Sequence, residues 1–248
     1  MDNLKALKTL KLFDNNLKLG PDCEIFKFEN LETLDLSLCN IKKFIKRDLT
    51  FNETTFERVK NLKDLNLYGN RIKLEGNCFK HLIQLTDLNL SYTTLESDKD
   101  YDIFSCLTNL ESISCEEIEP CSLFKLYRVS ELTNLVEFNL TIREHDLEQF
   151  GEMLRQKRRR GVVEVTNPTN DDLCYFILKD MTKLTGLYLY MCKLTHINKE
   201  VIGQMKDLTC IDLSINQIER IDDDTFDRLS NLEEVYLKGN PIQQINLN

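Results

Sequence analysis

The stretch from Met205 to Ile242 contains one pattern twice, and the two copies begin 24 residues apart. Both copies follow LxxLxLxxNxL, with Leu208, Ile211, Leu213, Asn216 and Ile218 in the first and Leu232, Val235, Leu237, Asn240 and Ile242 in the second. A constant period of this length is typical of a solenoid, because one short unit cannot bury its own apolar face and must stack on its neighbours. The period therefore constrains the fold more than any other feature of the chain.

Weaker copies of the pattern extend over almost the whole chain. Their first residues are Leu7, Leu31, Leu62, Leu85, Leu110, Leu135, Arg160, Leu184, Leu208 and Leu232. Apolar residues also recur six residues before these positions, from Ile25 to Phe226, and three residues before them, where only Lys157 is polar. We expect about ten repeats that bury these three columns against one another.

The pattern also predicts the local structure of each repeat. Side chains alternate around each LxL, which indicates a short strand with its two leucines pointing inward, and we expect these strands to stack in parallel. The amide of the repeated asparagine can satisfy backbone groups in the turn that follows the strand. Cys39 and Cys192 occupy this asparagine position in their own repeats.

These residues resemble the leucine-rich repeat, and the unit from Ile218 to Ile242, with Phe226, resembles its 24-residue subclass. The resemblance implies an α/β fold: a leucine-rich-repeat solenoid, or horseshoe, with a concave parallel β-sheet and convex loops or short helices. We expect residues 1–248 to form a single domain of this kind. The family binds very different partners, so the resemblance says little about function.

Three regions depart from the regular pattern. Extra residues between Phe44 and Phe56 are expected to form a loop or helical turn on the convex side. The repeats over about residues 110–183 are irregular; there, apolar spacing predicts a helix from about 145 to 160, followed by a strand at 162–165. The first and last repeats lie close to the ends of the chain, where the sequence shows no substantial cap.

Composition argues against a membrane protein and against a disulfide framework. No run approaches the ~18 apolar residues of a transmembrane helix, and the first residues alternate lysine with leucine, unlike a signal peptide. The nine cysteines are odd in number, and several follow the repeat. We therefore expect a reducing compartment, cytoplasmic or nuclear, and no membrane association.

Acidic residues dominate the outward positions of the predicted strands. These positions carry Asp14, Asp35, Asp64, Asp87, Glu116, Glu117, Glu119, Glu137, Glu144, Glu164, Asp212 and Glu234, against Lys11, Arg71, Lys193 and Lys238. The chain as a whole has a formal charge of -9. A partner protein with a basic surface would be steered towards such a face. Acidic side chains also keep an exposed sheet soluble, which is an alternative that needs no ligand.

Aromatic residues accompany the acids on the same predicted strands. Tyrosine offers a rigid apolar ring with a polar tip, which suits both a protein interface and packing along a strand. The predicted partner-binding residues are Tyr68, Tyr92, Glu116, Glu117, Glu137, Glu164, Tyr188, Tyr190, Asp212 and Tyr236, with Phe13 and Met191 beside them.

One basic cluster, Lys157, Arg158, Arg159 and Arg160, ends the predicted helix. It could contact RNA through phosphate groups. Cations at a helix C-terminus also complement the helix dipole, and no neighbouring aromatic residues offer a stacking platform for bases. Nucleic acid is therefore the less favoured partner.

Residue patterns for catalysis are missing from the sequence. His81, His145 and His196 fall in different repeats, and no nucleophile elbow or phosphate loop accompanies them. The run Asp222 to Asp224 lacks the alternating ligands and glycine of a calcium loop. We expect a protein that is not an enzyme, without cofactor, metal or small-molecule substrate.

The function predicted from the sequence is a non-catalytic protein–protein interaction module or scaffold that binds a basic partner protein on its acidic concave face. Two alternatives stay open. Similar intracellular repeat proteins include regulatory subunits that hold a phosphatase or another enzyme on the concave face. The basic cluster at residues 157–160 would instead suit a ribonucleoprotein-associated protein.

Overall fold

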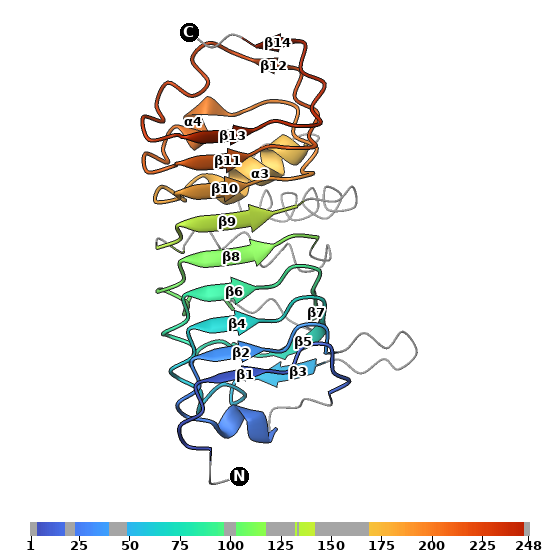
Figure 1. Ribbon diagram of the computed structural model, residues 1–248, viewed down its shortest axis with the longest axis vertical. Helices are drawn as coiled ribbons and strands as arrows, with labels where there is room; N and C mark the ends of the chain where they lie inside the picture. Colours follow the sequence, from blue (N-terminus) through green and yellow to red (C-terminus); the bar gives the residue numbers. More distant parts are fainter. Residues whose placement is uncertain are drawn as a thin grey trace, which may run out of the picture. The chain divides into compact units, whose positions relative to one another are not determined.

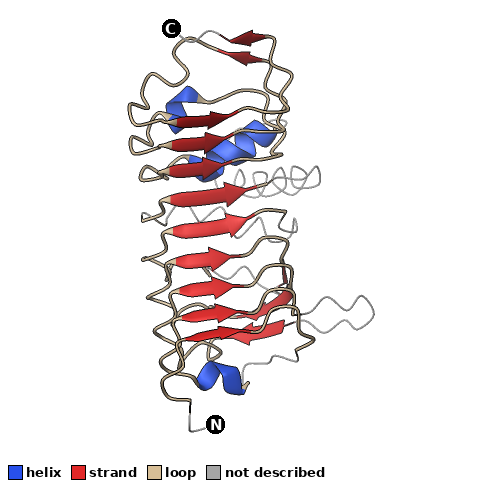
Figure 2. Ribbon diagram, in the orientation of Figure 1, coloured by secondary structure: helices blue, strands red, loops and turns tan. Residues whose placement is uncertain are grey.

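The structure is a computed structural model that describes residues 4–17, 23–39, 49–96, 103–117, 132, 134–141 and 169–245. The chain divides into two compact units, Met1–Arg128 (unit 1) and Val129–Asn248 (unit 2). Each unit is built on a parallel sheet of short strands, shown in Figures 1 and 2.

The main sheet of unit 1 has one strand for each repeat. Its strands, in spatial order, are β1 (Thr9–Lys11), β2 (Thr33–Asp35), β4 (Asp64–Asn66), β6 (Asp87–Asn89) and β8 (Ser112–Cys115). All pairs are parallel, and the register aligns Leu10, Leu34, Leu65, Leu88 and Ile113. This register confirms the strands predicted from LxL. The leucines inside the unit are buried because each coil covers the one before it.

A second sheet in unit 1 was not predicted. It consists of β3 (Leu49–Asn52), β5 (Arg71–Glu75) and β7 (Thr94–Glu96), all parallel. The expected loop or helical turn between Phe44 and Phe56 is thus wrong for residues 49–52. Leu49 and Phe51 are buried and alternate with outward Thr50 and Asn52, which is the side-chain period of a strand. Residues 44–48 lie outside the described residues.

Phenylalanine rings fill the core between the two sheets of unit 1. The ring centroids of Phe26 and Phe56 are 5.2 Å apart, those of Phe51 and Phe56 5.1 Å, and those of Phe56 and Phe79 5.8 Å. Sequence spacing assigned Ile25 to this column, but the short 3-10 helix η1 (Glu24–Lys27) buries Phe26 instead and leaves Ile25 partly exposed. The apolar column six residues before the repeat start is therefore shifted by one residue in this coil.

The main sheet of unit 2 repeats the arrangement. Its strands are β9 (Glu137–Leu140), β10 (Gly186–Tyr188), β11 (Cys210–Asp212) and β13 (Glu234–Tyr236). The parallel register aligns Phe138, Leu187, Ile211 and Val235. Among the described residues of unit 2, the other elements are the helices α3 (Asn170–Leu178) and α4 (Lys199–Ile202), which contact each other, and a two-stranded parallel sheet, β12 (Arg220–Ile221) with β14 (Gln244–Ile245).

Helix α3 was not predicted, although the sequence contains a capping box at its start. Thr169 and Asp172 form a capping box: the Asp172 backbone N–H donates to Thr169 Oγ1 over 3.2 Å, and the Thr169 N–H donates to Asp172 Oδ2 over 2.8 Å. Asp171 is buried and accepts hydrogen bonds from the backbone N–H and the hydroxyl of Thr195, so the helix also holds a neighbouring loop. The helix and strand expected at 145–160 and 162–165 lie outside the described residues.

The repeated asparagine links one coil to the next, as predicted. Asn216 Oδ1 accepts from the Leu194 N–H in the preceding coil, and its amide group donates to the carbonyls of Leu189 and Leu213, both over 2.8 Å. Asn70 and Asn240 make the equivalent bonds. Where cysteine replaces asparagine, its thiol donates instead, from Cys39 to the Leu12 carbonyl over 3.1 Å and from Cys192 to the Leu140 carbonyl over 3.2 Å.

The first and last strands leave part of their apolar columns uncovered. Leu4 and Val235 are exposed, whereas their counterparts inside each unit are buried. Among the described residues, no helix has the length and apolar character needed to cross a membrane.

Candidate partner-binding surface

The outward face of the unit 1 main sheet is acidic. Asp35, Asp64 and Asp87 lie on the neighbouring strands β2, β4 and β6, and Asp64 pairs in register with Asp87. The pKa of Asp64 is raised, first by partial burial and then by the negative charges of Asp87 and Asp35, while Lys11 opposes the shift. The three carboxylates therefore repel one another, and a cationic group placed above them would relieve that repulsion.

Asp35 belongs to a row of side chains that also shape the turn after each strand. Its Oδ1 accepts hydrogen bonds from the Ser37 backbone N–H over 2.9 Å and from the Ser37 hydroxyl. The same bond to the N–H two residues on is made by Asn66 to Tyr68, by Asn89 to Ser91 and by Asp212 to Ser214. Since asparagine does this without a charge, the turn does not require the negative charges of Asp35 and Asp212. This role was not predicted, although D/N-x-S/Y recurs at the ends of the strands.

Four of the predicted residues come together in unit 1, where the strands end. The rings of Tyr68 and Tyr92 have centroids 5.2 Å apart and planes inclined by 49°. The Tyr92 N–H donates to the Glu116 carbonyl over 2.7 Å, and Glu117 follows at the next turn position. Glu116 and Glu117 therefore lie on the coil next to the tyrosine pair, and both are partly exposed.

A turn residue with positive φ occurs at the same position in successive coils. The residues are Asp14, Leu38, Gly69, Tyr92 and Glu117 in unit 1 and Met191, Ile215 and Gly239 in unit 2, with φ from 49° to 75°. Their backbone N–H groups continue the ladder to the next coil, as in the 2.7 Å bond from Ile215 to the Lys238 carbonyl. At this position Tyr92, Met191 and Ile215 are exposed, whereas Leu38 is partly buried.

The outward face of unit 2 carries aromatic residues together with acidic residues. Tyr188, Asp212 and Tyr236 align in register on β10, β11 and β13. Tyr190, Met191 and Ile215 follow these strands and expose 40%, 41% and 44% of their surface. Ile215 was not predicted, although it holds the same turn position as the predicted residue Met191. The acids of this face are Glu137, Asp212 and Glu234.

The remaining predicted site residues fall elsewhere. Glu164 and the basic cluster Lys157, Arg158, Arg159 and Arg160 lie outside the described residues, as do Glu119 and Glu144. The assignment of Arg71 to the main sheet was wrong. Arg71 begins β5 in the second sheet of unit 1 and forms an ion pair with Glu96, because the chain has already turned away from the main sheet at Asn70.

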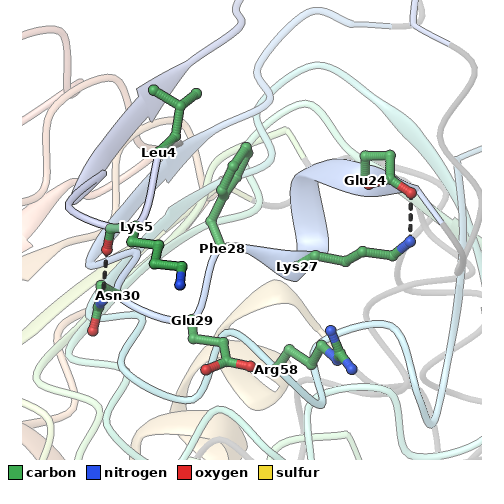
Figure 3. Close-up of a pocket in the computed structure, with 8 residues that line it drawn as sticks. All are labelled: Leu4, Lys5, Glu24, Lys27, Phe28, Glu29, Asn30 and Arg58. Atoms are coloured by element: carbon green, nitrogen blue, oxygen red, sulfur yellow. Dashed lines mark hydrogen bonds and ion pairs between the residues drawn. The ribbon is translucent and has the colours of Figure 1, made fainter. Parts of the chain in front are cut away.

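A pocket at the first coils of unit 1 contains none of the predicted partner-binding residues (Figure 3). Leu4 and Phe28 line it together with charged side chains from both neighbouring turns. Glu24 and Lys27 form an ion pair, and the Asn30 amide donates to the Lys5 carbonyl over 2.6 Å. The ion pair lies within η1 and the hydrogen bond connects the first two coils, so the pocket is explained by the packing at this end of the core.

Among the described residues, several cysteine and histidine side chains are buried or lie beside residues with a structural role. Burial raises the pKa values of the Cys115 and Cys174 thiols, which keeps them protonated. His196 Nδ1 lies 3.3 Å from Asp171 Oδ1, beside the loop that Asp171 holds. Among the described residues, no group of three or more histidine, cysteine or acidic side chains is arranged to hold a metal ion.

Two family models match the chain. A model described as "BspA type Leucine rich repeat region (6 copies)" matches residues 26–150, and one described as "Leucine rich repeat" matches residues 182–242. The first match covers half of the chain and includes strands of both units.

Curated relatives and solved structures agree with these matches. Mouse (Mus musculus) osteomodulin is 28% identical over 199 residues, covering 75% of this chain and 43% of that protein. Mouse epiphycan is 38% identical over 63 residues, covering 25% and 20%. The chain thus spans less than half the length of either relative.

The fold is similar to the leucine-rich repeat domain of APL1, with a TM-score of 0.59 and 19% identity over 99% of this chain and 59% of that one. It is also similar to an internalin from Listeria monocytogenes str. 4b F2365, with a TM-score of 0.52 and 17% identity over 99% and 69%. The family matches, the parallel LxL strands and the asparagine ladder lead to one conclusion: the chain belongs to the leucine-rich-repeat family.

Proposed function

We propose that the protein is a non-catalytic interaction module that binds a partner protein with a basic surface on the outward faces of its main sheets. Proteins of the leucine-rich-repeat family are typically protein-interaction modules. The observation that carries the proposal is the cluster of Asp35, Asp64 and Asp87. Partial burial, followed by the neighbouring charges of Asp87 and Asp35, raises the pKa of Asp64, and the three carboxylates lie outside the apolar core. A basic partner surface would neutralise this repulsion and be attracted from a distance.

The test compares capture of proteins by the wild-type chain with capture by the triple variant Asp35→Asn, Asp64→Asn and Asp87→Asn. The substitutions remove three charges with little change in shape, and Asn66 and Asn89 show that asparagine supports the same turn as Asp35. The matched control is Glu57→Gln, Glu219→Gln and Asp227→Asn, which removes three exposed charges outside the main-sheet strands.

A basic partner should be retained by the wild type and by the control, and lost both with the triple variant and at high salt. Cross-linking with mass spectrometry then has to place the partner's lysines next to the outward strand residues. Equal retention by the triple variant and the wild type, or cross-links confined to the other side of the strands, would refute the proposal.

We also propose a reducing compartment, specifically the cytoplasm. The support is the use of Cys39 and Cys192 as hydrogen-bond donors in place of asparagine, since a thiol in a disulfide has no hydrogen to donate. Alkylation of the protein from its native source, without reduction, should modify all nine cysteines. Recovery of oxidised cysteine pairs would contradict this location.

A further inference from the structure

Asp212 lies between two tyrosines on the face of unit 2. In the parallel register, Tyr188 on β10 and Tyr236 on β13 are its direct neighbours on either side. Adjacent strands are about 4.8 Å apart, so the two tyrosine positions are separated by about 10 Å, with one carboxylate between them. One oxygen of Asp212 accepts from the Ser214 N–H, which fixes the orientation of the carboxylate.

Both tyrosine side chains are held in place by their own strands or neighbours. A Cβ atom at Gly186 would lie 3.0 Å from Tyr188 Cε2 and 3.2 Å from its hydroxyl oxygen, so the Tyr188 ring lies over a position that only glycine leaves open. The Tyr188 hydroxyl is also close to the Cys210 thiol, and burial followed by this thiol raises the tyrosine pKa. The Tyr236 hydroxyl donates to Glu234 over 2.8 Å. The rings are therefore ordered before any ligand binds, which lowers the entropic cost of binding.

The charges around this row favour a cation. Glu137 and Glu234 lie on the neighbouring outward row, so Asp212 is one of three acids on these four strands, while Lys238 lies beyond Tyr236. Tyr190, Met191 and Ile215 form an exposed, largely apolar patch where β10 and β11 end. The surface thus offers negative charge and aromatic faces at one place and apolar area directly beside it.

These features match the arginine side chain more closely than any other protein group. A guanidinium ion is planar, can form two parallel hydrogen bonds with a carboxylate, and stacks on aromatic rings; an ammonium ion lacks the planar fork. We infer that unit 2 binds an arginine of the partner protein on Asp212 between Tyr188 and Tyr236, with an adjacent apolar side chain of that partner on Met191 and Ile215. The inference rests on the proposed function and specifies the chemistry of the segment that unit 2 binds.

The test is selection of binders from a random dodecapeptide library on the full chain. Enriched peptides should contain arginine within two residues of an aliphatic or aromatic residue. Replacing that arginine by citrulline, which has nearly the same shape without the charge, should weaken binding at least tenfold, and replacing it by lysine several-fold. Enrichment of peptides without arginine would refute the inference.

Three variants of the chain locate the site. Asp212→Asn should weaken the selected peptides at least tenfold with an unchanged melting temperature, because Asn66 and Asn89 make the same turn bond. Tyr236→Ala should weaken them several-fold. Asp227→Asn, which removes an exposed charge outside the sheet, should leave affinity unchanged. Peptides that bind Asp212→Asn as well as the wild type would place the arginine elsewhere.

The variant Gly186→Ala tests whether the position of the Tyr188 ring, rather than the stability of the protein, determines peptide affinity. The new methyl group displaces the Tyr188 ring, so its effect on peptide affinity should equal that of Tyr188→Ala, and combining the two should add nothing further. Additive losses would show that Gly186 does not act through Tyr188. If protein capture depends on Asp64 and Asp87 while peptides ignore Asp212, only this inference fails; if capture also ignores those acids, the proposed function fails.

Discussion

In unit 1 the outward row at the end of the strands carries Asp35, Asn66 and Asn89, with Asp64 and Asp87 in the row before it, whereas in unit 2 the row at the end of the strands carries Tyr188, Asp212 and Tyr236. The inward positions show no such contrast, since apolar residues fill them in both units, mostly leucine, isoleucine or phenylalanine, with Cys115 in unit 1 and Val235 in unit 2. The difference shows that the repeat fixes which side chains enter the core and leaves the outward ones free. Binding chemistry can therefore differ between the units without a change of scaffold.

The convex segments differ as well. Unit 1 places the three-stranded sheet β3, β5 and β7 behind its main sheet, while unit 2 uses the helices α3 and α4 and the strands β12 and β14. Both arrangements bury the apolar residues that precede each repeat start, such as Phe56 and Phe79 in unit 1 and Leu178 and Ile202 in unit 2. The backbone conformation of these segments is therefore less constrained than the side chains they bury.

The largest effect is expected from a charge placed at equivalent core positions of the two units. Leu36→Asp and Leu213→Asp each put a carboxylate at a fully buried site without a partner, and each should cost about 4 kcal/mol or more. Hydrogen exchange should show lost protection over several coils of the unit that carries the substitution. If either variant kept wild-type exchange, the equivalence of the inward columns would be wrong.

The asparagine ladder should contribute equally to both units. Asn70→Ala and Asn216→Ala each leave one backbone N–H and two carbonyls of the turn without their side-chain partner, which should cost about 2–3 kcal/mol. Urea unfolding measures the loss, and substitution of the exposed Asn16 by alanine is the control. Losses that differ by more than twofold would indicate that the ladder supports one unit more than the other.

The two turn glycines sharpen the comparison because their surroundings differ. Gly69→Ala adds a methyl group at φ +68° that would collide with Leu38, while Gly239→Ala adds one at φ +75° at 3.1 Å from Ile215 Cγ1. Each should cost about 1 kcal/mol for the left-handed backbone, with a larger total at Gly69. Thermal unfolding of both variants provides the ranking, and a costlier Gly239→Ala would reverse it.

The smallest effect concerns the acidic face of unit 1 and depends on pH. The pKa of Asp64 in the folded chain is raised above its ordinary 3.8, so its ionised form is less favourable in the folded chain than in the unfolded one. Asp64→Asn should therefore stabilise the protein at pH 7 by less than about 1 kcal/mol, because the side chain is partly exposed. The gain should shrink as the pH falls through the raised pKa and vanish below 3.8. A gain that persists at pH 3 would have another cause.

The sequence predicted those features that the repeat period determines. Once LxL marks a strand, the period sets the register, so Leu34 pairs with Leu65 and Ile211 with Val235 as expected. The asparagine bonds follow for the same reason, since their donors and acceptors recur at fixed distances along the chain. The pairing of Tyr68 with Tyr92 was harder to anticipate, because Tyr92 holds the turn position of Gly69 and Tyr68 lies one residue before it.

Features outside the strand and its turn were harder to predict. Residues 49–52 alternate like a strand, but the partners that make them a sheet, β5 and β7, lie in other repeats and at positions the pattern leaves open. Helix α3 begins within the irregular repeats at about residues 110–183. The repeated asparagine is absent there, so the repeat pattern did not point to the capping box. Ile215 was missed, although Tyr92 and Met191 at the same left-handed position were predicted, because an isoleucine in a sequence is expected to lie in the core.

The asparagine ladder also has a mechanical consequence. Asn70, Asn216 and Asn240 each accept a backbone N–H from the coil before, so each of these three coils is fastened to its predecessor by the same short set of bonds. A force applied between the chain ends would load these sets one after another from the terminal coil inwards. Since a 24-residue coil extends by about 80 Å when drawn out, the chain would lengthen in regular steps of roughly that size, with each step releasing one coil.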